Sequence, residues 1–300
     1  MKHRIIWKLT AVLISAGIGA VVPAAASDSG MVFSMKAARL YLNESDLRDS
    51  DSVLDGSLRI DQYAGITTMK LHLVSDEPIR IENLDFARDS SRKEPDGSFK
   101  QCFFVSHGDS YVTRTNENGE LLNKVLWYGS NNVPPDTGVV EQPESPFLIY
   151  QLRVPKGTES GVYHVGISKA VSVNEAGQND YDFIVYNEDG KIDVPCEDTR
   201  VIVEPDAMRG DTDCDGLITP FDATAALCCA SLATAGFDLI DPELETDLEE
   251  ILKTPFIHTA LRAADVDLNG YVEPYDASMI LTYASQQIAG FSPEWDEIVR

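Results

Sequence analysis

Apolar and polar residues alternate along most of the chain between residues 32 and 203, which is the pattern of half-buried strands. Met69, Leu71 and Leu73, for example, are separated by polar neighbours, so we expect these three side chains to face a core. Turn-forming clusters rich in Gly, Asn and Pro separate the runs. The pattern predicts one β-sandwich or jelly roll of about nine strands. Besides the strand that holds Met69, the predicted strands lie at residues 33–42, 58–63, 79–86, 102–105, 125–128, 147–154, 163–167, 183–186 and 201–203.

The pattern changes after Glu204, where Pro205 ends the last predicted strand. Residues 223–232 and 277–288 are predicted helices, and residues 241–252 form a further predicted helix that is rich in acidic side chains. The sequence therefore predicts a mainly β protein with a small α part. We expect the sandwich over residues 27–204 and a helical module over residues 205–300.

The first 26 residues have the pattern of a secretory signal peptide. Lys2, Arg4 and Lys8 surround the start of an uncharged apolar run over residues 9–22, and small residues follow at positions 24–26. A membrane-spanning helix needs about 20 apolar residues, more than this run provides. No later stretch is long enough either, so we expect a secreted, extracellular chain without membrane insertion.

The charge of the chain is strongly negative, with 49 acidic and 24 basic side chains and a formal net charge of −25. Nucleic acids are bound through clustered Lys and Arg, so this balance argues against a nucleic-acid partner. Residues 27–200 hold 29 acidic and 17 basic side chains, whereas residues 201–300 hold 20 and 4. The acidity is therefore concentrated in the second module.

Two segments of this module have the spacing of a calcium-binding loop. Acidic side chains or Asn occupy positions 1, 3, 5 and 12, glycine occupies position 6, and position 7 offers its carbonyl. Clustered carboxylates repel one another until a cation neutralises them, so the loops predict two structural calcium ions. The expected ligands are Asp211, Asp213, Asp215, Leu217 and Asp222 in the first loop, and Asp265, Asp267, Asn269, Tyr271 and Asp276 in the second.

Both loops differ from the standard EF-hand because position 12 is Asp. The first loop also lacks an entering helix, because residues 204–210 contain a proline and are too short. In each repeat position 10 is proline, position 11 is aromatic, and a predicted helix follows. This duplicated loop and exiting helix resembles a dockerin module over residues 201–300. The resemblance implies a cohesin-bearing scaffold protein as the partner, bound through the helices that follow the loops. The chain would be held at the cell surface through that scaffold.

The resemblance also implies which residues contact the partner. The loops begin at Asp211 and at Asp265, and the length beyond a compact dockerin lies in residues 238–264. An alternative is that Leu227 and Leu281 are core residues that join the two helices. The implied partner-binding residues are Pro220, Phe221, Leu227 and Cys228 in the first repeat, and Pro274, Tyr275, Leu281 and Thr282 in the second.

Three parts of the sandwich region resemble a cohesin module. They are residues 65–76, residues 125–129, and the predicted strand pair formed by residues 146–155 and 161–167. The resemblance implies a nine-stranded jelly roll that captures a dockerin-bearing protein. An unrelated β-sandwich is the alternative.

The sequence contains no G-x-S-x-G, H-E-x-x-H or glycine-rich phosphate loop, so we expect no enzyme. A glycoside hydrolase needs only two well-placed carboxylates, and such a small polysaccharide-degrading enzyme stays open as an alternative. A carbohydrate-binding module with plant cell-wall polysaccharide as its partner is another. Its candidate aromatic side chains are Trp127, Tyr128, Tyr150 and Tyr163.

The five cysteines are an odd number for an exported chain, so at least one thiol is free or bonds between molecules. Cys102 and Cys196 are the candidate pair within the sandwich. Taken together, these features lead to the hypothesis of a non-catalytic adaptor that resembles a small cellulosomal scaffoldin.

Overall fold

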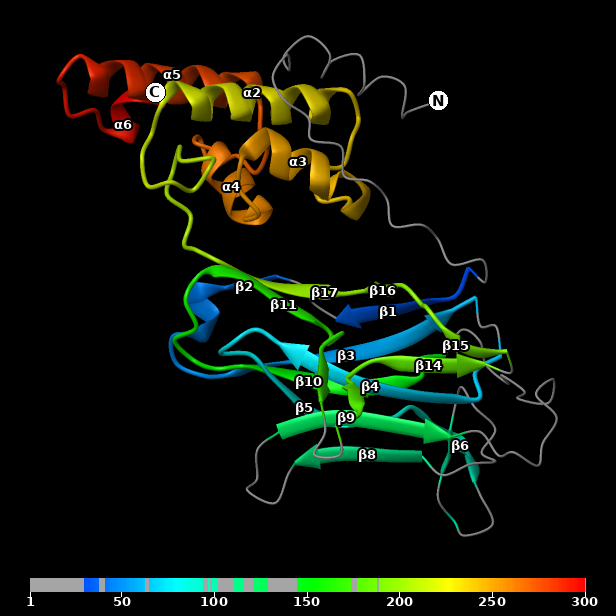
Figure 1. The fold of residues 1–300 in the computed structure, drawn as a ribbon. Helices are drawn as coiled ribbons and strands as arrows, with labels where there is room; N and C mark the ends of the chain where they lie inside the picture. Colours follow the sequence, from blue (N-terminus) through cyan, green and yellow to red (C-terminus); the bar gives the residue numbers. More distant parts are fainter. Residues whose placement is uncertain are drawn as a thin grey trace.

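A computed structural model describes residues 30–37, 41–62, 65–93, 97, 99–101, 110–115, 121–128, 145–173, 177–187 and 189–299. The chain forms a β-sandwich up to strand β17 (Thr199–Glu204), and a helical module follows (Figure 1). We call the part from residue 205 to residue 299 the C-terminal module. The predicted signal peptide lies outside the described residues.

The first sheet of the sandwich has the strand order β16-β1-β3-β10-β5. Its strands pair antiparallel, except that β1 pairs parallel with β16, although the two lie near opposite ends of the sandwich sequence. The strands are β1 (Val32–Ala37), β3 (Ser52–Asp61), β5 (Arg80–Phe86), β10 (Leu148–Val154) and β16 (Cys196–Glu197).

The second sheet has the order β15-β14-β4-β11-β17-β2, and β9 joins β4 and carries β8 at its other side. Within it, β17 and β2 pair parallel. Two short hairpins, β6–β7 and β12–β13, lie outside the two sheets. The strands of the second sheet are β2 (Tyr41–Asn43), β4 (Thr68–Ser75), β8 (Ser110–Thr115), β9 (Leu121–Tyr128), β11 (Gly161–Ile167), β14 (Ile184–Asn187), β15 (Gly190–Ile192) and β17 (Thr199–Glu204). The hairpin strands are β6 (Arg88–Lys93), β7 (Phe99–Gln101), β12 (Val171–Val173) and β13 (Asn179–Tyr181).

The core of the sandwich is built from the inward-facing residues of both sheets. Met69, Leu71 and Leu73 of β4 are buried, as the alternation predicts, and the residues between them are only partly covered. On the opposite sheet, Tyr150 of β10 is buried in the same cluster. A sandwich core of this kind follows from period-two alternation, because successive strand residues point to opposite faces.

Two features of the sandwich differ from the sequence prediction. Residues 33–42 are not one strand, because β1 belongs to the first sheet and β2 to the second. The described residues form 17 strands rather than about nine, since short hairpins and edge strands add to the two main sheets. Their few residues carry too little alternation to stand out in the sequence. The predicted strand at residues 102–105 lies outside the described residues.

The C-terminal module contains three helices that the sequence predicts and two that it does not. The predicted ones appear as α2 (Pro220–Thr234), α5 (Pro274–Ile288), and the pair of η3 (Pro242–Leu244) and α3 (Glu245–Leu252). The unexpected ones are α4 (Ile257–Ala264) and α6 (Trp295–Ile298). In the described part of the sandwich, the only helix is the short 3-10 turn η1 (Glu44–Leu47).

Figure 1 shows α2 and α5 side by side, with α3 and α4 between them and the sandwich. Two small apolar clusters hold these helices together, one around Ile280 of α5 and one around Leu248 of α3. Helices α2 and α5 thus lie on the side of the module that faces away from the sandwich.

None of the helices described is both long enough and apolar enough to cross a membrane.

Candidate metal sites and docking surface

Three carboxylates of the first loop converge on one point. One oxygen from each of Asp211, Asp213 and Asp222 lies within 4.8 Å of the other two. The main chain holds them there, because Gly216 N donates to Asp211 Oδ2 at 2.9 Å and Thr212 N donates to Asp222 Oδ1 at 2.7 Å. The sharp turn that brings these groups together puts Gly216 at φ 87°, in the left-handed region that favours glycine.

The second loop repeats this arrangement with Asp265, Asp267 and Asp276, whose oxygens again lie within 4.8 Å of one another. Gly270 N donates to Asp265 Oδ2 at 2.8 Å, and Val266 N donates to Asp276 Oδ1 at 3.0 Å. Each of these contacts has its counterpart at the same positions of the first loop.

The backbone of the two loops repeats in the same way. Position 4 is left-handed in both, at φ 58° for Cys214 and 61° for Leu268, although neither residue is a glycine. A left-handed non-glycine residue is uncommon, so its recurrence at the same loop position indicates that both loops adopt one defined conformation.

The last acidic residue of each loop also lies in the first turn of the helix that follows, and it accepts a hydrogen bond from the residue that caps that helix. Asp222 Oδ2 accepts the N–H of Thr219 at 2.8 Å, and Asp276 Oδ2 accepts the N–H of Glu273 at 2.8 Å. Each pair forms a capping box, which satisfies amide groups that the first helical turn leaves free. Both Asp side chains are fully buried. One carboxylate thus links each loop to the start of α2 or α5.

The charged form of the loop carboxylates is disfavoured in both loops. Burial raises the pKa of Asp213 to about 6, and the negative charges of Asp222 and Asp215 contribute to the rise. Burial also raises the pKa of Asp211 and that of Asp276. Both effects indicate that a cation between the carboxylates would be favourable. The donors are all oxygens, which is the set that a hard cation such as Ca²⁺ prefers, so the residues present fit this ion.

The remaining expected ligands line the same loops. Asp215 Oδ1 accepts the N–H of Leu217, and Asn269 Oδ1 accepts that of Tyr271, each at 2.8 Å. The side chains of Leu217 and Tyr271 are exposed. Their expected role rests on the main-chain carbonyl, which does not depend on where the side chain lies.

The residues implied to contact a partner lie on the exposed surfaces of α2 and α5. Leu227 is 46% exposed and Leu281 is 47% exposed, so the alternative that they join the helices as core residues is wrong. Cys228 is half-buried and carries a free thiol. We call the set the docking face; its other members are all exposed and are Pro220, Phe221, Pro274, Tyr275 and Thr282.

The docking face carries no charge. Neither α2 nor α5 contains Lys or Arg, and their only acidic residues are the buried Asp222 and Asp276. Its polar side-chain groups are the hydroxyls of Tyr275 and Thr282 and the thiol of Cys228. Several hydroxyls of these helices bond back to the main chain, as Ser231 Oγ does to Leu227 O at 2.7 Å. Contact with a partner here would depend on apolar surface rather than on ion pairs.

The candidate aromatic residues for carbohydrate binding do not form an exposed group among the described side chains. Tyr150 is buried in the core, and its hydroxyl donates to Lys36 O at 3.1 Å. Tyr163 packs partly against the same core. Trp127 and Tyr128 lie at the end of β9. Cys196 carries a free thiol, and its candidate partner Cys102 lies outside the described residues.

Near the C-terminus lies a structural contact that the local sequence pattern does not predict. The ring of Trp295 stacks on Tyr283 with a centroid distance of 4.4 Å, and Arg209 lies 5.3 Å from the ring centroid of Trp295. A side chain at Gly210 would collide with the same ring. The aromatic and glycine residues are visible in the sequence, but their contact joins the start of the C-terminal module to its end. Only the fold brings them together.

No family model and no curated protein matches the chain. Among solved structures, it is similar to the third ScaB cohesin of R. flavefaciens, solved in complex with a group 1 dockerin, at 15% identity and a TM-score of 0.37, covering 60% of this chain and 98% of that one. It is also similar to a type III cohesin module of the ScaE cell-surface anchoring scaffoldin of Ruminococcus flavefaciens, at 13% identity and a TM-score of 0.37, covering 63% and 96%. The similarity to a type II cohesin domain of Acetivibrio cellulolyticus has 11% identity and a TM-score of 0.34, and it covers 57% of this chain and 94% of that one. TM-scores this low do not assign a fold or a function.

Proposed function

We propose that the chain is a non-catalytic adaptor of a cellulosome-type complex. The C-terminal module acts as a dockerin: it binds two calcium ions and docks on a cohesin carried by another scaffold protein. The sandwich acts as a cohesin and captures a dockerin-bearing protein. The adaptor is secreted and held at the cell surface through the scaffold.

The observation that carries this proposal is the repetition of one loop and helix within the C-terminal module. In both copies, three carboxylates converge within 4.8 Å, and the last of them caps the helix that bears the docking face. A cation bound by the carboxylates therefore also stabilises the start of that helix. Asp211, Asp213, Asp215 and Asp222 would hold the first ion, with the Leu217 carbonyl. The second would be held by Asp265, Asp267, Asn269 and Asp276, with the Tyr271 carbonyl.

The docking face supports a protein partner rather than a small ligand. Its exposed apolar side chains occur in matched positions, such as Phe221 with Tyr275 and Leu227 with Leu281. Exposed apolar groups gathered on one surface are typical of protein–protein contacts. Because the face is uncharged, we expect binding that changes little with ionic strength.

The proposal is tested by binding assays with the full chain against panels of immobilised partners. In calcium, the chain should bind at least one cohesin, and it should release that cohesin when a chelator is added. It should also capture at least one dockerin through the sandwich. Retention by cellulose, xylan or pectin without capture of any dockerin would instead identify the sandwich as a carbohydrate-binding module. Hydrolysis of these polymers would identify an enzyme.

A further inference from the structure

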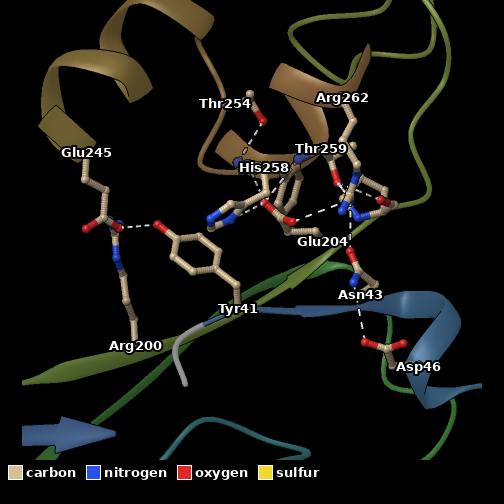
Figure 2. Close-up of polar contacts among 12 residues, drawn as sticks. Tyr41, Asn43, Asp46, Arg200, Glu204, Glu245, Thr254, His258, Thr259 and Arg262 are labelled. Carbon is tan, nitrogen blue, oxygen red and sulfur yellow. Dashed lines mark hydrogen bonds and ion pairs between the residues drawn. The ribbon is translucent and has the colours of Figure 1, made fainter. Parts of the chain in front are cut away.

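A set of polar contacts joins the sandwich to α3 and α4 (Figure 2). Arg200 of β17 donates from Nη2 to Glu245 Oε1 and Glu249 Oε1, both at 2.6 Å. The hydroxyl of Tyr41 on β2 donates to the same Glu245 oxygen at 2.7 Å. One face of α3 is thus fixed to two neighbouring strands.

At the centre of these contacts lies Glu204, the last residue of β17, which is only 1% exposed. Its Oε1 accepts the backbone N–H of His258 at 2.9 Å and of Thr259 at 3.4 Å, at the first turn of α4. Its Oε2 lies 3.7 Å from Arg262 Nη2, one turn further along. A buried carboxylate is tolerated because these donors compensate for its lost hydration.

Further contacts hold the C-terminal module against the sandwich. The ring of Tyr41 meets the ring of His258 edge to face at a centroid distance of 4.2 Å. Arg262 Nη2 also donates to Asn43 Oδ1 at 2.9 Å, and Arg48 forms an ion pair with Asp206. The strands β2 and β17 therefore form the surface against which α4 packs. We call Tyr41, Asn43 and Glu204 of these strands the seat of α4.

The seat is continuous with both calcium loops. Helix α4 ends at Ala264, directly before the second loop, and the short segment 205–210 connects Glu204 to the first loop. The two entrances are joined to each other, since Gly210 N donates to Ala263 O at 2.8 Å and Arg209 Nε donates to Val266 O at 2.6 Å. A change in the position of α4 must therefore displace the start of the second loop.

We propose that the seat of α4 on the sandwich and the calcium loops form one cooperative unit. Calcium at the loops stabilises the seat, and by linkage the seat raises the affinity for calcium. The surfaces of α3 and α4 that contact β2 and β17 thus bind the sandwich of the same chain. This contact keeps the docking face on the far side of the module, where a partner on another chain can reach it. This inference rests on the proposed calcium binding and adds to it a role for the sandwich.

The test uses calcium titrations of the full chain and two interface variants, Arg200→Ala and Glu204→Ala. Arg153→Ala is the matched control, because Arg153 also bridges two carboxylates, Glu82 and Asp51, but within the sandwich. We expect the apparent calcium affinity to fall by about fivefold or more in each interface variant. The control should stay within about twofold of the wild type. Should Glu204→Ala fail to fold, Arg200→Ala alone decides, since its side chain is partly exposed.

Amide hydrogen exchange of β2 and β17 is the second measurement. These strands belong to the sandwich, yet chelation should speed their exchange in the wild type and in Arg153→Ala. The inference is overturned if the wild type and Arg200→Ala bind calcium equally well and chelation leaves the exchange rates of β2 and β17 unchanged. In that case the proposed function stands. A wild-type chain that binds no calcium contradicts both.

Discussion

The ring of Tyr150 on β10 covers the backbone of Gly56, its register partner on the adjacent strand β3. A Cβ atom placed on Gly56 would lie 2.1 Å from the Tyr150 ring, closer than any packed pair of carbons allows. The ring is buried, and its hydroxyl is fixed by the carbonyl of Lys36 at 3.1 Å. Glycine is therefore required at position 56 by close packing.

The substitution Gly56→Ala should lower the free energy of unfolding of the sandwich by about 1–3 kcal/mol, because the buried ring must shift to admit the methyl group. Gly161→Ala is the control, since a Cβ there meets Tyr163 at an ordinary 3.5 Å. Chemical denaturation measures both. Equal stabilities of the two variants would contradict the packing described for Tyr150.

Trp295 should contribute to the stability of the C-terminal module, although it is near the end of the chain. Trp295→Ala removes the stack on Tyr283 and the contact with Arg209 and Gly210, so we expect a loss of about 2 kcal/mol. Phe291→Ala, at a side chain that is 68% exposed, should change stability by less than about 0.5 kcal/mol. Thermal unfolding in calcium compares the two, and an effect of equal size would argue against the stack.

Removal of one charge from the first loop should weaken calcium binding without unfolding the module. Asp213→Asn keeps the shape of the side chain but lowers the ligand charge, so we expect the affinity to fall by about tenfold or more. Glu250→Gln removes an exposed charge of α3, outside the loops, and should leave the affinity nearly unchanged. Titration calorimetry compares the calcium affinities of the two variants. An unchanged affinity in Asp213→Asn would show that Asp213 is not a calcium ligand.

The docking face should be needed for partner binding and not for folding. Leu227→Ser combined with Leu281→Ser removes two exposed side chains, so the stability should stay within about 0.5 kcal/mol per site. The affinity of the chain for an immobilised cohesin should fall by about tenfold or more, since apolar side chains buried at the centre of such interfaces dominate the binding energy. Ile240→Ser, at another exposed apolar residue outside α2 and α5, is the control. Full binding by the double variant would place the docking surface elsewhere.

The sequence predicts the parts of the fold that depend on local pattern. The burial of Leu71 follows from alternation, and the convergence of Asp211 with Asp222 follows from loop spacing, because each depends on a few neighbouring residues. The helices α2 and α5 follow their loops as expected, and both begin earlier than predicted, at the proline of position 10.

The contacts that join distant parts of the chain could not be predicted from local patterns. Alternation identifies a strand but not its neighbour, so nothing in residues 33–42 indicates that β1 and β2 belong to different sheets. The sequence does not predict α4, whose eight residues are few for an isolated helix, so this helix depends on packing for its stability. The seat of α4 on Glu204 joins segments that are far apart in the sequence, which follows only from the assembled fold.

The most direct test of the account is the far-UV circular dichroism of the full chain in calcium and in a chelator. Without calcium, the crowded carboxylates should destabilise the starts of α2 and α5, so the helical signal should fall while the sandwich stays folded. Restored calcium should recover the signal. A spectrum and a melting curve that are identical in calcium and in chelator would contradict the central claim that the two loops are calcium sites that build the docking module.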